Sequence, residues 1–171
     1  RLCRDWSSDV CSSDLLKEKM AKVGYSKLEI DHENKTVFLT ETGMQLDLGA
    51  IAKGYIADRV KAVMLEKGYV SGIISLGGNI LTVGEKPNGS PWSIGVRNPE
   101  IEESVTELGI LTEKDMSVVS SGVYERYFTA NDQRYHHLIN PFTGYPEQNE
   151  IMSITIVSKK SVDGDALSTT T

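Results

Sequence analysis

The sequence has few of the residues that would support several classes of site. Only two of its 171 residues are cysteine, Cys3 and Cys11, and both lie among the first 15. Residues 16–171 therefore contain no cysteine, which excludes a disulfide framework, a zinc–thiolate site and a cysteine nucleophile there. The sequence also has no run of about 18 apolar residues, so it predicts no membrane-spanning helix.

Basic residues are outnumbered: 18 Lys and Arg stand against 24 Asp and Glu, giving a net charge of −6. Without a clustered basic face the sequence predicts no nucleic-acid binding, which requires phosphates to be neutralised. The apolar content of 39% is too high, and the net charge too small, for a disordered chain. We expect an ordinary globular protein with a substantial core.

Residues 4–15 read Arg-Asp-Trp-Ser-Ser-Asp-Val-Cys-Ser-Ser-Asp-Leu, which resembles the translation of a sequencing adapter. We therefore expect residues 1–15 to be a cloning or assembly scar outside the fold. Residues 16–171 are expected to be a partial domain, an internal fragment of a longer protein whose leader or anchor would lie upstream.

The hydrophobic pattern predicts an α+β fold of mostly antiparallel strands with a few helices. Residues 27–31 and 36–40 alternate around a turn and predict a hairpin. A helix is predicted from about Gly49 to Lys67, with Gly68 as its stop and with an apolar face formed by Ile51, Ala52, Ile56, Val60, Val63 and Met64. Further strands are predicted at residues 70–76, 80–83, 92–97, 105–111, 117–121, 135–139 and 152–157.

Two Gly-containing segments are candidates for binding an anion. Asp47-Leu-Gly-Ala-Ile-Ala-Lys-Gly54 is predicted to lead into the helix, and a helix N-terminus presents unpaired amides and partial positive charge. Lys53 could reach a phosphate. From this segment alone, the favoured alternative is that Asp47 simply caps the helix and that Lys53 is a solvated surface residue. Ser75-Leu-Gly-Gly-Asn79 follows a strand, and its paired glycines indicate a strained turn or close ligand approach.

A third segment, Tyr135-His-His-Leu-Ile-Asn-Pro-Phe-Thr-Gly-Tyr-Pro146, contains two adjacent histidines followed by a rigid turn. In an extended strand His136 and His137 point to opposite faces, so they cannot both bind one metal ion from that strand. A strand histidine is more often structural than catalytic, and its advantage is a pKa near neutrality.

The fourth segment is Asp163-Gly-Asp165 followed by Ser168-Thr169. Asp165 and Thr169 are four residues apart and would share one face of a helix. A carboxylate beside a hydroxyl suits Mg²⁺, with water and substrate phosphate as further ligands. Helix capping by Asp163 or Asp165 is the equally weighted alternative.

Taken in order, these segments resemble the ApbE family of bacterial FAD:protein FMN transferases. The resemblance rests on six segments, here residues 47–55, 77–79, 92–99, 121–128, 137–146 and 165–169. Asn140 departs from the Asp that the family commonly has before the Pro, so this position supplies no carboxylate.

The resemblance implies a role for individual residues. Asp47, Lys53 and Ile139 match positions that contact FAD, and His137 matches a histidine implicated in catalysis. The metal-binding positions are matched by Ala50 (through its carbonyl), Asp165, Ser168 (through its backbone) and Thr169. His136 stands where other members vary and is expected to be structural.

The resemblance also implies a reaction. Mg²⁺ would activate the FAD pyrophosphate, a Ser or Thr hydroxyl of an acceptor protein would attack the FMN-side phosphorus, and AMP would leave. The acceptor would carry an Asp-x-x-(Ser/Thr)-Gly-Ala-(Ser/Thr) motif, commonly in a membrane redox-complex subunit. The location would be extracytoplasmic, at the bacterial inner membrane or in the periplasm. Three alternatives stay open: an FAD pyrophosphatase, a non-catalytic flavin-binding module and a metallo-hydrolase based on the His136–His137 pair.

Overall fold

The computed structural model describes residues 13–100, 106–130, 133–147 and 149–170. Cys3, Cys11, most of the adapter-like segment and the first residue of the strand expected at 105–111 lie outside these ranges. The chain divides into two compact units, residues 1–47 with 128–148 and residues 48–127 with 149–171.

The first unit begins with a helix and a β-hairpin. Its elements are α1 (Ser13–Met20), the 3₁₀ helix η1 (Tyr25–Lys27), β1 (Leu28–Asp31), β2 (Thr36–Leu39), β8 (Tyr127–Ala130) and β9 (Gln133–His136). β1 and β2 are antiparallel, with Leu28 opposite Leu39 and Asp31 opposite Thr36, which confirms the predicted hairpin. The hairpin turn is closed by the Asp31 carboxylate, which accepts hydrogen bonds from the amides of Asn34 and Glu33. These hydrogen bonds lower the pKa of Asp31, and the bond from the Asn34 amide contributes most.

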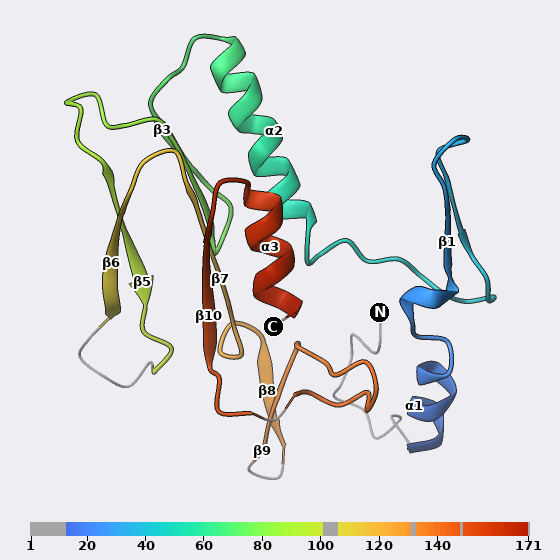
Figure 1. The fold of residues 1–171 in the computed structure, drawn as a ribbon. Helices are drawn as coiled ribbons and strands as arrows, with labels where there is room; N and C mark the ends of the chain where they lie inside the picture. Colours follow the sequence, from blue (N-terminus) through green and yellow to red (C-terminus); the bar gives the residue numbers. More distant parts are fainter. Residues whose placement is uncertain (1–12, 101–105, 131–132, 148, 171) are drawn as a thin grey trace. The chain divides into compact units, whose positions relative to one another are not determined.

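The second unit is built on a four-stranded antiparallel sheet in the order β10-β7-β4-β3. Its strands are β3 (Gly72–Ser75), β4 (Asn79–Val83), β7 (Ser117–Gly122) and β10 (Ser153–Ser158). Two helices, α2 (Ala52–Glu66) and α3 (Ser161–Thr170), lie side by side against one face of this sheet (Figure 1). A separate hairpin is formed by β5 (Trp92–Arg97) and β6 (Glu107–Glu113).

The core of the second unit lies between α2 and the β3–β4 pair. Leu81, Val83 and Ala57 are fully buried, Ile74 is nearly so, and Met64 packs against them. α2 thus contacts the sheet through the small Ala57 in its first half and the long Met64 in its second half. The same arrangement leaves room for α3 beside the start of α2.

The predicted apolar face of α2 is wrong in most of its members. Ile51, Ile56, Val60 and Val63 are all at least 40% exposed, and the inward positions are Gly54, Ala57 and Met64. Gly54 and Ala57 are small residues that a hydrophobicity pattern does not count as a face, and Gly54 lies so close to α3 that a Cβ there would overlap the backbone of Ser161 and Val162. The predicted helix stop at Gly68 is confirmed, because Gly68 has a φ of +83° just after the last turn.

The α+β class with mostly antiparallel strands is confirmed. Every predicted strand has an observed counterpart with ends shifted by up to about three residues, whereas β8 and α1 were not predicted. Within the described ranges no helix is long and apolar enough to cross a membrane.

Candidate functional site

The start of α2 carries two of the predicted site residues, Ala50 and Lys53. A turn precedes the helix, in which the amides of Ile51 and Ala52 both donate to the Leu48 carbonyl, at 3.0 and 2.8 Å. The helix therefore begins at Ala52, three residues later than predicted. Asp47 lies too far upstream to cap it, so the capping alternative for Asp47 is wrong. Ala50 is exposed in the turn immediately before the helix.

Lys53 connects the start of α2 to the Gly-Gly-Asn loop. Its Nζ donates to the Gly77 carbonyl at 3.2 Å. Gly77 and Gly78 have φ values of +56° and +83°, a left-handed conformation in which a side chain would be strained. A Cβ on Gly78 would also lie 3.2 Å from the Ser120 carbonyl of β7. The paired glycines thus let the loop turn tightly between β3 and β4, with Lys53 held against it.

α3 brings Asp165 to the same helix start. Asp165 is 3% exposed, and its Oδ2 accepts a hydrogen bond from the Gly54 amide at 2.8 Å. In a helix that continued back through the turn, this amide would donate to the Ala50 carbonyl, four residues earlier. Asp165 accepts the hydrogen bond from the Gly54 amide instead, so the Ala50 carbonyl is not required as the acceptor of that amide. Asp165 lies inside α3 and does not cap its own helix as the alternative supposed; its carboxylate instead accepts an amide from the first turn of α2.

Ser168 and Thr169 follow Asp165 along α3. Both hydroxyls donate to the Asp165 carbonyl, at 3.1 Å from Ser168 and 3.3 Å from Thr169. The Ser168 hydroxyl also lies 2.9 Å from that of Ser121 on β7, and Ser121 is the donor because the Ser168 proton is already used. Ser168 is buried, whereas Thr169 is exposed. The predicted placement of Asp165 and Thr169 one turn apart on a helix is confirmed.

The donor chemistry of this region fits a hard cation. No cluster of three or more His, Cys, Asp or Glu side chains able to hold a metal ion occurs in the part of the chain that the structure describes. The candidate donors are all oxygens: the Ala50 carbonyl, one carboxylate on Asp165, the backbone of Ser168 and the hydroxyl of Thr169. A set with a single carboxylate suits Mg²⁺, which retains water or substrate phosphate in its remaining positions.

The two adjacent histidines, His136 and His137, differ in their surroundings. His136, at the end of β9, is partly buried, and its Nε2 lies 2.8 Å from the Glu147 carbonyl. A carbonyl only accepts, so Nε2 is the donor in this hydrogen bond. His137 is the next residue and is exposed. The predicted alternation, with one histidine turned inward and the other outward, agrees with the partly buried His136 and the exposed His137.

The segment after His137 is the rigid turn that the sequence predicts. Ile139 forms a β-bridge with Pro146, and between them the Asn140 Oδ1 accepts from the amides of Phe142 and Thr143, at 2.8 and 3.3 Å. Asn140 thus acts in the turn through its amide oxygen, an interaction for which a carboxylate is not required.

The structure brings together three of the four candidate segments. Lys53 contacts the Gly-Gly-Asn loop, and Asp165 contacts the start of α2, all within the second unit. Asp47, His137 and Ile139 belong to the first unit.

A group of polar residues that hold α3 in place was not predicted from the sequence: Asp58, Asn79, Ser117, Ser121 and Ser161. Asn79 and Ser121 were noted only as parts of motifs. One sequence feature could have indicated these contacts: Ile51 and Lys160, at the starts of the two helices, are both poor capping residues. A helix start without a local acceptor predicts that one comes from elsewhere.

Comparison with known proteins places the whole described chain in one family. The model of the ApbE family matches residues 2–171, a range that includes both units. An FAD:protein FMN transferase from Klebsiella pneumoniae (strain 342) is 42% identical over 154 residues, covering 90% of this chain and 46% of that protein. Another from Treponema pallidum (strain Nichols) is 36% identical over 169 residues, covering 91% and 46%.

The fold agrees with this assignment. The crystal structure of the ApbE protein from Thermotoga maritima MSB8 matches with a TM-score of 0.84 and 35% identity, covering 92% of this chain and 50% of that one. The chain thus spans about half the length of the relatives it matches. On the family match and on these similarities, the chain belongs to the ApbE family.

Proposed function

We propose that the protein transfers the FMN moiety of FAD to a Ser or Thr hydroxyl of an acceptor protein, in a Mg²⁺-dependent reaction that releases AMP. The observation that carries the proposal is the 2.8 Å hydrogen bond from Gly54 to Asp165. It joins the two segments whose residues are expected to bind the metal, Ala50 before α2 and Asp165 to Thr169 on α3. The names of the relatives support the same flavin chemistry.

Each predicted residue has a distinct task in this reaction. Ala50, Asp165, Ser168 and Thr169 would hold Mg²⁺, which when bound supplies charge neutralisation of the pyrophosphate and polarises the phosphorus under attack. Lys53, whose Nζ lies at the Gly77 carbonyl, would add a positive charge for the phosphates. Asp47 and Ile139 would contact the flavin nucleotide.

His137 would act as the general base. An unprotonated imidazole nitrogen of His137 accepts the proton of the acceptor hydroxyl as its oxygen forms a bond to the FMN-side phosphorus. The P–O bond to the adenosine phosphate breaks, and AMP leaves with the electron pair. Most of the acceleration would come from positioning and charge stabilisation, as in other phosphoryl transfers.

The test uses the complete gene product with FAD, MgCl₂ and a peptide containing Asp-x-x-Thr-Gly-Ala-Thr. The peptide is expected to gain the mass of FMN minus water, and an equal amount of AMP is expected by chromatography. EDTA and Asp165→Ala should abolish both products. Asp163→Ala is the matched control, since it removes an exposed carboxylate from the same helix, and it should retain activity.

Other products would identify the alternatives. Free FMN and AMP with an unmodified peptide would support an FAD pyrophosphatase, in which water replaces the acceptor hydroxyl. FAD that remains bound without turnover would support a flavin-binding module. Protein that neither binds nor converts FAD would contradict every flavin-based function and leave the metallo-hydrolase.

We further propose that the acceptor is a membrane redox-complex subunit and that the reaction takes place outside the cytoplasm, at the inner membrane or in the periplasm. This part of the proposal is supported by the family resemblance. Deleting the gene should remove a flavin-fluorescent band from denaturing gels of the membrane fraction. A fusion to alkaline phosphatase should be active, and activity only with a cytoplasmic reporter would contradict the proposed location.

A further inference from the structure

Both helices of the second unit begin without a local side-chain cap. The N-cap residue of α2 is Ile51, which makes no capping hydrogen bond among the described residues. α3 begins at Ser161, directly after Lys160, and a lysine side chain has no acceptor atom. The first amides of an α-helix have no partner within the helix, so both helix starts need acceptors from elsewhere.

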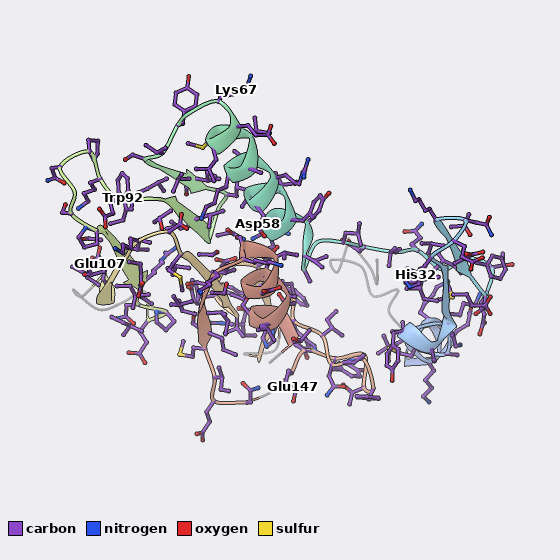
Figure 2. All side chains as sticks on the ribbon, turned by 45° about the horizontal axis from the view of Figure 1, so that its top comes forward. His32, Asp58, Lys67, Trp92, Glu107 and Glu147 are labelled. Carbon is purple, nitrogen blue, oxygen red and sulfur yellow. The ribbon has the colours of Figure 1, made fainter. Side chains whose placement is uncertain are left out.

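Each helix receives its acceptor from the other. Asp165 of α3 accepts from Gly54 of α2 at 2.8 Å. Asp58 of α2 accepts from the first two amides of α3, with Oδ1 2.9 Å from Ser161 N and Oδ2 3.0 Å from Val162 N. We call these contacts the reciprocal cap. Figure 2 shows Asp58 where α2 meets the start of α3.

The reciprocal cap fixes both the separation and the rotation of the helices. Gly54 and Asp58 are one turn apart on α2, and Ser161 and Asp165 are one turn apart on α3. Two links between two helices, one turn apart, prevent either helix from rotating without breaking one of them. Removing the Asp58 link leaves Asp165 as the single carboxylate that connects the helices.

The start of α3 is also held by the sheet, but not from the side of α2. The Ser117 hydroxyl donates to Ser161 Oγ at 3.0 Å, and Ser161 Oγ donates to Asn79 Oδ1 at 2.7 Å. All three side chains are fully buried. These contacts anchor α3 to β4 and β7, whereas Asp58 orients it relative to the start of α2, where Ala50 lies.

We propose that Asp58 is a positioning residue for the metal-binding set, acting by holding Asp165 and Thr169 in register with Ala50. The inference rests on the proposed function. Asp165 uses Oδ2 for Gly54, so the direction of its other oxygen depends on the rotation of α3. Asp58 controls that rotation from one turn earlier. Mg²⁺ requires near-ideal octahedral geometry, so a small rotation of α3 lowers its affinity.

The experiment compares Asp58→Ala and Asp58→Asn with the matched control Asp163→Asn in the complete gene product. Asp163 lies in the same first turn of α3 but is exposed. Two quantities are measured: the increase in Tm on titration with MgCl₂ alone, and the Mg²⁺ concentration for half-maximal FAD turnover. The first needs neither FAD nor catalysis, so it reports on the metal site directly.

For Asp58→Ala we expect the half-saturating Mg²⁺ concentration to rise by about 10- to 100-fold, as for other residues that orient metal ligands. The Mg²⁺-dependent increase in Tm should require correspondingly more MgCl₂. Asp58→Asn should be intermediate, because its amide oxygen can accept one of the two hydrogen bonds. Asp163→Asn should match the wild type in both measurements.

An unchanged Mg²⁺ requirement in Asp58→Asn, together with a lower Tm in the absence of metal, would overturn the inference and leave Asp58 a purely structural cap. Asp58→Asn decides the question if Asp58→Ala does not fold. A wild-type protein with neither a Mg²⁺-dependent Tm nor Mg²⁺-dependent FAD turnover would instead overturn the proposed metal site, and the inference with it.

Discussion

Replacing Gly54 with alanine tests how closely the reciprocal cap holds the two helices. A Cβ at this position would lie 2.3 Å from the Ser161 carbonyl oxygen and 2.7 Å from Val162 Cα. Both atoms belong to the backbone, so no side-chain rotation can relieve the overlap. Reaching an ordinary van der Waals separation requires the helices to move apart by about 1 Å.

Three contributions set the size of the effect. Alanine favours a helix over glycine by about 1 kcal/mol. The overlap costs about 1–3 kcal/mol, as for other insertions into packed interiors. The same displacement weakens the hydrogen bond from Gly54 to Asp165, which adds about 1 kcal/mol. We therefore expect Gly54→Ala to lower the free energy of unfolding by about 1–3 kcal/mol in total.

The assay is urea unfolding of the complete gene product, followed by circular dichroism. Gly109→Ala in β6 is the control, because a Cβ there would meet no atom within 4 Å, and it should change the stability by less than about 0.5 kcal/mol. Gly54→Ala should also raise the Mg²⁺ requirement. The reasoning would be refuted by a Gly54→Ala protein as stable as the Gly109→Ala protein with the wild-type Mg²⁺ requirement.

Further predictions concern other contacts. Asp115 Oδ1 lies 2.8 Å from Lys61 Nζ, and this hydrogen bond holds the pKa of Asp115 below its ordinary value of 3.8. In urea unfolding at pH 7, Asp115→Asn should lower the free energy of unfolding by about 1 kcal/mol. Because the pKa is lowered on folding, this difference should persist above pH 3.8 and disappear as the pH falls below it; a constant difference down to pH 2 would contradict the assignment. Ser161→Ala removes the donor to Asn79 and should lower the free energy of unfolding by about 1–3 kcal/mol, and an unchanged urea midpoint would argue against the network. His137→Ala should lower kcat by about 10²- to 10⁴-fold with an unchanged Tm, and equal losses of kcat in His136→Ala and His137→Ala would refute their division of roles.

Much of the fold follows from local sequence signals. The β1–β2 hairpin was predictable because its strands alternate around a turn that Asp31 closes by local hydrogen bonds. The end of α2 was predictable because Gly68 adopts the left-handed conformation that ends helices. The face of α2 was not predictable, because Gly54 packs against α3, which lies more than 100 residues away in the sequence, and Ala57 packs against the β3–β4 pair.

The residue types of the candidate site could be predicted from the sequence, but the contacts between its two helices could not. The i, i+4 spacing correctly placed Asp165 and Thr169 on one helix. No spacing rule connects Asp165 with Gly54, or Asp58 with Ser161, because these contacts depend on how two helices pack. The same limit applies to Asp58, whose carboxylate looks like that of any solvated helix residue until the start of α3 is placed beside it.

The reciprocal cap also has a consequence for the order of events during synthesis. Asp165 follows Gly54 by 111 positions, and at ribosomal rates of roughly 5–20 residues per second it emerges about 5–20 s later. During that interval the 15-residue α2 has no partner for its first turn, and isolated helices of this length are only marginally stable in water. The start of α2 can therefore be fixed by this contact only after the nascent chain has delivered α3, which makes it a late-forming part of the molecule.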